Sequence, residues 1–346
     1  MIAIIETTVN IPTNLLHFAD NFTKFGHRDV LFLIIGDVKS PEGISEIEAM
    51  LKAKGFQAEY WDIERQRKLG GSLIKRMPLN SGRRRNIGTL LALRGGVDWA
   101  IYLDDDNHPT DEDFITAHTL GHHPLISSPE RWFNTGELCD TRVPIFLRGF
   151  PLSRRFHESN ALITDGNLPT KIVANQGLCL GIPDVDAMTH LTLNQDDIRV
   201  RRLKASWGIV GGTFIPMNSQ NTAIAGRALS SYYQPELGRN TDIIAGYILQ
   251  KVAHCMGDVV SVGKPCTRHI RNQHSFISDM ESEAPSFRLI EDMLPLLEWE
   301  EIEYSSGAPS LMRPPSYLDC YVSLVKKLKL PKDVKRDMLA WSEDIA

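Results

Sequence analysis

The sequence predicts an α/β fold in which helices cover both faces of a mostly parallel central sheet. Segments typical of strands and of helices alternate over the first 120 residues, which is the order that builds a parallel sheet. Residues 29–35 are almost entirely apolar, as expected for a strand buried on both faces. A chain of 346 residues is also long enough to bury a large core.

The first half of the chain supplies the clearest elements. Strands are expected at residues 1–8, 29–35, 57–61 and 97–103, and helices at residues 14–25, 45–54, 81–94 and 110–118. In the first helix Leu15, Phe18, Ala19 and Phe22 recur every three or four residues, which places them on one face. The order of these segments favours an open, doubly wound sheet.

Beyond residue 124 the pattern is more broken. Short strands are expected at residues 171–174, 208–214 and 258–262, and helices at residues 221–231 and 240–255. The tail contains three helical stretches. We therefore predict a catalytic domain over residues 1–285 and a helical appendage over residues 286–346.

Composition narrows the class of protein. The net charge is −5, so nucleic acid is not an expected partner. No apolar run approaches the roughly 20 residues that span a bilayer, and the first residues lack the features of a signal peptide. The five cysteines form no CxxC pair, which favours a cytoplasmic protein without disulfides. The oligomeric state, including a homo-oligomer, is left open.

Three consecutive acids, Asp104, Asp105 and Asp106, follow the strand at residues 97–103. Ligands of open α/β sheets bind beyond the carboxyl ends of the strands, and Mg²⁺ and Mn²⁺ prefer carboxylate oxygens. Alternate residues of an extended segment point the same way, so Asp104 and Asp106 are candidate ligands of one metal ion. The alternative is a solvated loop that caps the next helix.

Polar residues at neighbouring positions are candidates for binding a nucleotide. Arg83, Arg84 and Arg85 open the helix before the acidic strand end, and both arginine and helix N-termini attract phosphate. Thr8 and Asp37 end the first two strands at the same edge. The alternatives are a solvated run of arginines and an ordinary structural turn.

A later segment, residues 264–276, combines imidazole and guanidinium groups. His269 could complete a metal shell begun by two aspartates, and Arg268 and Arg271 could neutralise phosphate. A histidine in such a segment can equally be a surface or core residue.

Together these features resemble a glycosyltransferase of the GT-A fold and, more narrowly, the reversibly glycosylated polypeptides, or UDP-arabinopyranose mutases. Besides the acids, four segments in the same order carry the resemblance: LRGFPLSRR (147–155), NQGLCLGIPDVDAMTHL (175–191), LGRNTDIIAGY (237–247) and RHIRNQHSF (268–276). They extend from about residue 100 to residue 276, and the tail shows no resemblance.

The resemblance implies roles for individual residues. It makes the three acids the motif that binds metal and diphosphate, His269 a later metal ligand, and Arg155 the position at which that family accepts a sugar. A simpler role for Arg155 is a hydrogen-bond clamp, because a guanidinium group stays protonated and is a poor nucleophile. Asp242 matches the second acid of the family's acidic pair and is a candidate general base, or else a helix cap.

The sequence also departs from that family around the sugar pocket. Thr241 replaces the first acid of the pair, and Ile244 and Tyr247 replace tryptophans. We therefore predict a Mn²⁺- or Mg²⁺-dependent glycosyltransferase that uses a nucleotide-sugar donor, with UDP expected by resemblance, and a small or biosynthetic acceptor. The first alternative is a self-glycosylating UDP-sugar mutase. The second is a nucleotide-sugar binding protein without activity.

Overall fold

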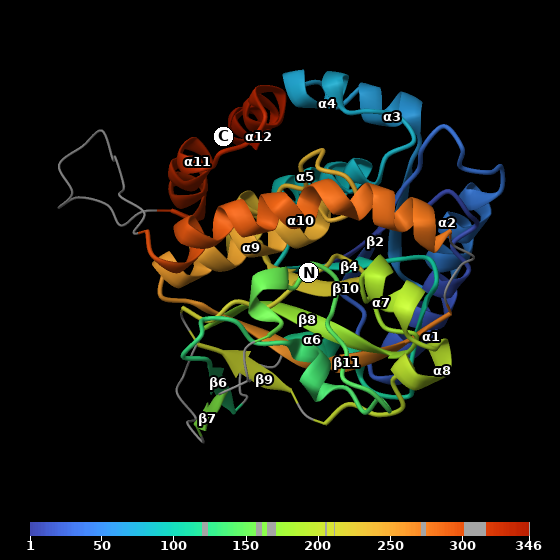
Figure 1. Ribbon diagram of the computed structural model, residues 1–346. Coiled ribbons are helices and arrows are strands. Elements are labelled where there is room, and N and C mark those ends of the chain that lie inside the picture. The colour runs from blue at the N-terminus through green and yellow to red at the C-terminus, as the bar shows by residue number, and fades with distance from the viewer. Residues whose placement is uncertain are drawn as a thin grey trace.

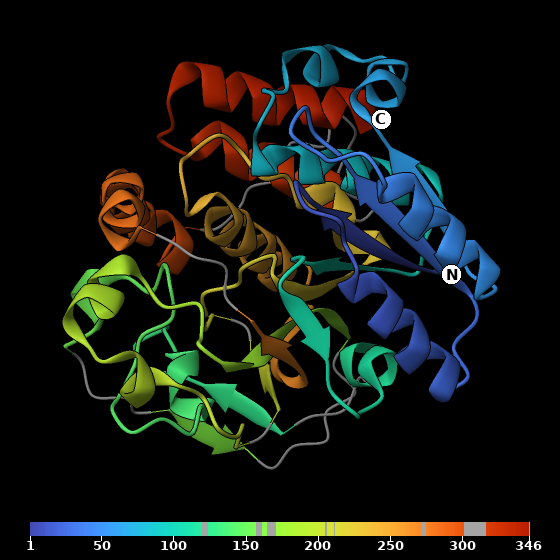
Figure 2. The ribbon, with the colours of Figure 1, turned by 90° about the vertical axis from the view of Figure 1, so that its right-hand side faces the viewer.

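The computed structural model describes residues 1–119, 124–156, 161–164, 171–204, 206–210, 212–270, 275–300 and 316–345. An eleven-stranded sheet runs through the molecule in the order β3-β2-β1-β4-β10-β8-β11-β9-β6-β7, and β5 pairs with β11 off this path (Figures 1 and 2). The predicted α/β class, with helices on both faces, is confirmed.

The first four strands form the parallel part of the sheet. They are β1 (Ile2–Thr7), β2 (Val30–Ile35), β3 (Gln57–Trp61) and β4 (Trp99–Leu103). Alternate residues of β1 enter separate cores: Ile4 packs in the core that holds α1 (Asn14–Lys24) and α2 (Ile44–Ala53), whereas Ile5 packs with α5 (Arg85–Arg94). Both faces of β1 are therefore buried, as its apolar run predicts, whereas β3 at the edge of the sheet is only partly buried.

The other half of the sheet is mixed. β10 (Asn221–Ala225) runs antiparallel between β4 and β8 (Ile172–Gly181), and β11 (Val259–His269) lies parallel to β8. The edge contains β9 (Trp207–Ile209), β6 (Leu125–Ser127) and β7 (Leu162–Thr164), while β5 (Asn107–Pro109) pairs with β11. The parallel arrangement thus holds for β1 to β4 and ends where β10 joins.

Helical elements surround the sheet. The shorter ones are α3 (Ile63–Arg67), α4 (Ser72–Arg76), η1 (Gly82–Arg84), α6 (Phe114–Thr119), η2 (Thr135–Leu138), η3 (Leu152–Arg154), α7 (Ala187–Thr192), α8 (Gln195–Ile198) and η4 (Gly226–Ser231). The longer ones are α9 (Thr241–Cys255), α10 (Phe276–Glu298), α11 (Tyr317–Lys327) and α12 (Lys332–Ile345). Within the described parts of the chain, none of them combines the length and hydrophobicity needed to cross a lipid bilayer.

The helix predicted over residues 221–231 is wrong. The first five of these residues form β10, the central strand that joins the two halves of the sheet, and the rest form η4. Every residue of β10 is buried, so the segment lacks the alternation that identifies a half-buried strand. Periodicity alone does not separate such a strand from a buried helix.

The predicted domain boundary at residue 286 is also wrong. It falls inside α10, which Ser275 caps and which continues through Pro285. Beyond α10, the side chains of Tyr321, Met338 and Trp341 are buried in the same core as α9 and the sheet. The described part of the tail therefore packs into the core of the main domain and is not a separate appendage.

Replacing Trp341 tests this integration. The side chain is 1% exposed, its indole donates to the carbonyl of Ser230 (3.0 Å), and its ring stacks on Tyr233. Trp341→Ala should lower the free energy of unfolding by about 3–5 kcal/mol, because it opens a cavity in the core. Urea denaturation followed by circular dichroism measures this change.

The matched control is Trp299→Ala, since Trp299 is 69% exposed and contacts the guanidinium of Arg131. That change should cost less than about 1 kcal/mol. An equal, small loss for both variants, or a separate early transition for the tail in the wild type, would contradict an integrated core.

Candidate functional site

Polar residues gather where the parallel strands β1, β2 and β4 end, at one edge of the sheet. A cavity of about 430 Å³ opens there, which we call the first cavity. Its lining includes Thr8, Asp37, Arg85 and all three acids from Asp104 to Asp106. The structure thus brings together six of the side chains that the sequence predicts to bind the nucleotide.

A second cavity, of about 520 Å³, adjoins the first. The two cavities share the lining residues Asn80, Ser81, Gly82, Arg85 and Asp104. The rest of the second cavity is lined by Arg83, Ser219, Gln234, Glu236, Gly238, Arg239, Thr241, Asp242 and Ser282. No apolar side chain is among these lining residues, so this cavity offers hydrogen-bond partners on every described wall.

Arg85 and Asp104 stand at the junction of the two cavities. One terminal nitrogen of Arg85 donates to Asp104 Oδ1 (2.5 Å) and to the carbonyl of Leu103 (3.3 Å). The other donates to the carbonyl (3.0 Å) and the hydroxyl of Ser219. This buried guanidinium therefore joins α5 to the end of β4 and to the segment that precedes β10.

Asp105 points to a different partner. Its Oδ2 accepts hydrogen bonds from the hydroxyl of Thr8 (2.7 Å) and the side-chain amide of Asn10 (2.8 Å). The predicted nucleotide-binding residue Thr8 thus fixes the acidic loop against the end of β1.

Arg83 and Arg84 are not a solvated run. Both are buried: Arg83 donates to the hydroxyl of Tyr233 (2.5 Å) and Arg84 to the side-chain oxygen of Gln66 (2.5 Å). Asp37 accepts from the backbone amide of Ser81 (3.0 Å) and lies 3.5 Å from the guanidinium of Arg84. Arg84 lines neither cavity, so its predicted contact with a nucleotide is replaced by a structural role.

Asp106 and His269 form the remaining pair of predicted ligands. His269 Nε2 lies 3.1 Å from Asp106 Oδ2, and Nδ1 lies 2.7 Å from the carbonyl oxygen of Ile182. The pairing of β5 with β11 places His269 opposite Asn107, next to Asp106. Burial lowers the pKa of His269, but the carboxylate of Asp106 outweighs this effect and the net pKa is raised.

Arg268, a predicted phosphate ligand, lines neither cavity. Arg268 is exposed, because it precedes His269 in β11 and neighbouring residues of a strand point to opposite faces. Arg271 lies outside the described residues. Neither can be assigned a phosphate contact from the structure.

Asp242, the predicted general base, is bound on both oxygens. Arg148 donates to Oδ1 and Oδ2 (3.0 Å each), and the backbone amide of Ser219 donates to Oδ2 (3.1 Å). Arg148 also pairs with Asp184 (2.8 Å), which accepts from Asn218 as well. Burial raises the pKa of Asp184, but Arg148 outweighs it and the net pKa is lowered.

Arg155 lies in another ion pair. Its guanidinium contacts Asp186, whose side chain is fully buried and caps α7 by accepting from the amide of Thr189 (2.8 Å). Arg155 also lies over the ring of Phe146 and lines neither cavity. The geometry gives Arg155 an anchoring role, because the pair joins the end of η3 to the start of α7.

Sequence reasoning missed Glu6 and the role of Arg148. Glu6 is fully buried in β1 and accepts from Asn14 (2.8 Å). Burial raises its pKa well above the usual range, the hydrogen bond from Asn14 opposes this, and Asp105 and Asp104 add to it. The sequence signal for Glu6 is a single carboxyl within a mostly apolar strand. For Arg148 no local signal exists, since its partners lie 36 and 94 residues away.

Among the residues that the structure describes, no group of three or more His, Cys, Asp and Glu side chains is arranged to hold a metal ion. Asp104 faces Arg85, Asp105 faces Thr8 and Asn10, and only Asp106 faces His269. Of the predicted ligands, Asp106 and His269 lie together, and Asp104 pairs with Arg85.

Known proteins similar to this chain were found by sequence. No family model matches. Probable UDP-arabinopyranose mutase 2 of Solanum tuberosum is 26% identical over 239 residues, which cover 66% of this chain and 59% of that protein. UDP-arabinopyranose mutase 1 of Arabidopsis thaliana is 27% identical over 192 residues, covering 53% and 47%. Probable glycosyltransferase STELLO1 of Arabidopsis thaliana is 21% identical over 310 residues, covering 79% and 40%.

The predicted resemblance to UDP-arabinopyranose mutases and glycosyltransferases is thereby confirmed. The chain spans 40% to 59% of the length of these relatives. Among solved structures, a mycobacterial protein superposes with a TM-score of 0.41 at 11% identity, over 89% of this chain and 80% of that one. For S. aureus TarS the TM-score is 0.36 at 13% identity, over 99% and 71%. Superpositions this loose do not identify a fold family.

The ion pairs of Arg148 with Asp184 and Asp242 allow a test of what stabilises the wall of the second cavity. Arg148→Met leaves Asp184 and Asp242 buried without their cation and should cost about 3–5 kcal/mol of stability at about pH 7. In the wild type the pKa of Asp184 is lowered, so its contribution is present above about pH 4 and is lost below it. In the variant, burial favours the neutral form of the unpaired carboxyl groups. The loss of stability relative to the wild type should therefore be smaller at about pH 5 than at about pH 7.

Urea denaturation at the two pH values measures the deficit. The control is Arg202→Met, because Arg202 is 85% exposed and pairs with Asp140 at the surface. Its cost should stay below about 1 kcal/mol at both pH values. A deficit for Arg148→Met that is equally small, or independent of pH, would show that the cluster does not carry buried charge.

Proposed function

We propose that this protein is a glycosyltransferase that uses a UDP-sugar donor and a divalent metal ion, and that transfers the sugar to a small or biosynthetic acceptor. One observation carries the proposal: two joined cavities meet at Arg85 and Asp104, at the carboxyl ends of β1, β2 and β4. A nucleoside diphosphate fits the first cavity. The second, lined by polar side chains and glycine, suits the hydroxyl groups of a sugar.

The sequence relatives support this assignment. Their names describe UDP-arabinopyranose mutases and a probable glycosyltransferase, and the mutase names state a sugar carried by UDP. The proposal names the donor and the acceptor by class only.

Asp106 and His269 fit a divalent ion. If Nδ1 of His269 donates to the carbonyl of Ile182, Nε2 and a carboxylate oxygen of Asp106 lie 3.1 Å apart, where a metal ion would take the place of a proton on Nε2. A carboxylate and an imidazole are suitable ligands for Mn²⁺, and diphosphate oxygens would complete the shell. A bound ion would supply positive charge to the leaving diphosphate.

The protein's own residues would prepare the donor. Arg85 lines both cavities, and because its terminal nitrogens already donate to Asp104, Leu103 and Ser219, it would contribute its positive charge where negative charge develops on the diphosphate. Thr8 and Asn10 hold Asp105 in place, which leaves Asp106 oriented towards His269. We assign Asp242 to the wall of the second cavity, because Arg148 and Ser219 already occupy its oxygens.

The alternative, a self-glycosylating mutase, requires a nucleophile near the donor. Arg155 is the position implied by the resemblance, yet its guanidinium pairs with Asp186 and lines neither cavity. A carboxylate partner stabilises the protonated guanidinium, which lacks a free lone pair. This geometry favours transfer to a separate acceptor.

The metal claim is tested with Asp106→Asn. UDP with Mn²⁺ should raise the melting temperature of the wild type, since a ligand at a hundredfold excess over its Kd adds about 2.7 kcal/mol. Asp106→Asn should lose this rise, because a neutral amide is a weaker ligand than a carboxylate, while the melting temperature without ligand stays close to that of the wild type. Differential scanning fluorimetry with and without Mn²⁺ measures both.

The control is Asp111→Asn, an exposed acid that lies 3.8 Å from Lys24 at the end of α1. It should respond to UDP and Mn²⁺ like the wild type. If Asp106→Asn keeps the full metal-dependent rise, Asp106 does not bind the metal and the proposed donor site is wrong.

The choice between transfer and self-glycosylation is tested with a UDP-sugar labelled in the sugar. After incubation with Mn²⁺ and denaturation, the protein should remain unlabelled, because the Arg155 guanidinium is paired with Asp186. Liquid scintillation and peptide mapping measure the label. Stoichiometric label on Arg155, absent from Arg155→Lys, would instead establish the mutase.

A further inference from the structure

A third hollow lies between α4 and α12 and shares no lining residue with the first or second cavity. Its volume is about 500 Å³, and we call it the α4–α12 groove. Of its eight lining residues, four are basic, Arg76, Lys332, Lys335 and Arg336, whereas Glu343 is the one acid. The groove is therefore strongly cationic.

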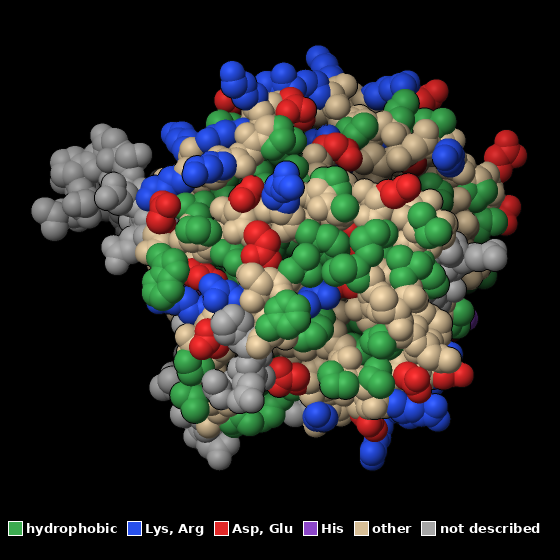
Figure 3. All heavy atoms as spheres, viewed as in Figure 1, with side chains coloured by type: hydrophobic (Ala, Val, Ile, Leu, Met, Phe, Trp, Pro, Cys, Tyr) green, Lys and Arg blue, Asp and Glu red, His purple; other side chains and the backbone are tan. Residues whose placement is uncertain are grey.

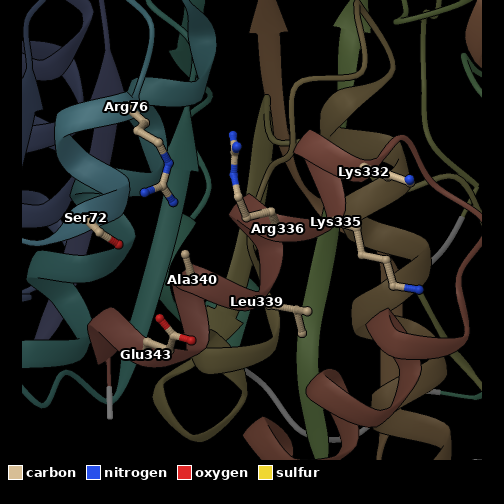
Figure 4. A pocket seen from close by; sticks show the side chains of 8 residues that line it. All are labelled: Ser72, Arg76, Lys332, Lys335, Arg336, Leu339, Ala340 and Glu343. Carbon is tan, nitrogen blue, oxygen red and sulfur yellow. The ribbon is translucent and has the colours of Figure 1, made fainter.

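The two arginines face each other. Figure 4 shows the guanidinium groups of Arg76 and Arg336 converging across the groove from α4 and α12, while Glu343 lies at the far end beyond Ala340. Lys335 donates to the carbonyls of Lys326 (2.5 Å) and Leu328 (3.2 Å), so it is committed to the end of α11. The arginine pair marks the end of the groove where an anion would bind.

This pair is incompletely neutralised. Asp337 lies 3.1 Å from Arg76 and 3.4 Å from Arg336, and its other oxygen is 3.5 Å from Arg83. Among the described residues, no second acid forms an ion pair with Arg76 or Arg336. Asp337 is thus shared by Arg76, Arg336 and Arg83, of which Arg83 also has Glu236 at 3.5 Å. The side chains of Arg76 and Arg336 are 35% and 62% exposed. Like charges held this close favour an added anion.

The surroundings strengthen the positive charge. Residues 326–336 contain six Lys or Arg and a single Asp, in a chain whose net charge is −5. Figure 3 shows Lys and Arg side chains gathered at the top of the molecule, where Figure 1 places α4 and α12. The field around the groove would attract anions from solution.

We propose that the α4–α12 groove binds a phosphate monoester. The converging guanidinium groups suit the oxygens of one phosphate, because arginine donates paired hydrogen bonds to planar or tetrahedral oxyanions. Leu339 and Ala340 line the adjoining wall and suit the carbon part of an ester. The phosphate could belong to a soluble metabolite or to a lipid headgroup. This site goes beyond the proposed transferase and does not depend on it.

The test uses Arg336→Ala, since Arg336 is exposed and its loss should leave the fold intact. The matched control is Arg202→Ala, another exposed arginine that pairs with a single aspartate. Glycerol 3-phosphate is titrated into each protein by calorimetry at low salt, in metal-free buffer so that the donor site is not engaged. Arg336→Ala should weaken binding about fivefold or more, the loss of one charge-assisted contact, and Arg202→Ala should not.

A second arm uses vesicles of phosphatidylcholine with or without phosphatidic acid. Binding of glycerol 3-phosphate without cosedimentation identifies a soluble ligand, whereas cosedimentation only with phosphatidic acid, lost in Arg336→Ala, identifies a headgroup. Binding of neither probe, or equal losses in the two variants, would overturn the proposal. UDP binding is scored separately, so failure of the groove and failure of the donor site are distinguishable.

Discussion

The buried ion pair between Arg85 and Asp104 holds together the part of the molecule on which both cavities depend. Arg85 begins α5, and its guanidinium reaches the end of β4, the carbonyl of Ser219 before β10, and the first of the three acids. Removing either partner would leave the other charge buried without its counter-ion, which is destabilising. The junction of the parallel and mixed halves of the sheet is therefore also the junction of the two cavities.

Three adjacent carboxylates would repel one another if they shared one environment. The structure separates them: Asp104 faces a guanidinium, Asp105 faces the neutral donors Thr8 and Asn10, and Asp106 faces His269. Glu6, buried close by, is shifted towards its neutral form and adds little charge. Of the three acids, only Asp106 faces an imidazole nitrogen, and it is the acid that the proposed donor site assigns to the metal ion.

The sequence predicted most of the parallel half of the fold, because β1, β2 and β4 are mostly apolar runs and α1 has an apolar face, although it missed the short helices α3 and α4. β3 spans residues 57–61 as predicted. The central strand β10 was missed because it is buried on every side. For the site, the strand-end rule brought Thr8, Asp37 and the acids to one edge. It could not show that Arg84 turns inward to Gln66, or that Arg148 binds Asp242 across 94 residues. Such partners depend on the register of distant strands.

Described residues of the tail contact elements that line the two cavities but do not line either cavity themselves. Asp344 of α12 accepts from the backbone amides of Ser72 (3.3 Å) and Leu73 (3.0 Å) and so fixes the start of α4. Trp341 stacks on Tyr233, whose hydroxyl accepts from Arg83 in the wall of the second cavity. The chain runs from α4 into residues 80–82, which line both cavities. The tail, predicted to be a separate appendage, thus stabilises the start of α4 and one wall of the second cavity.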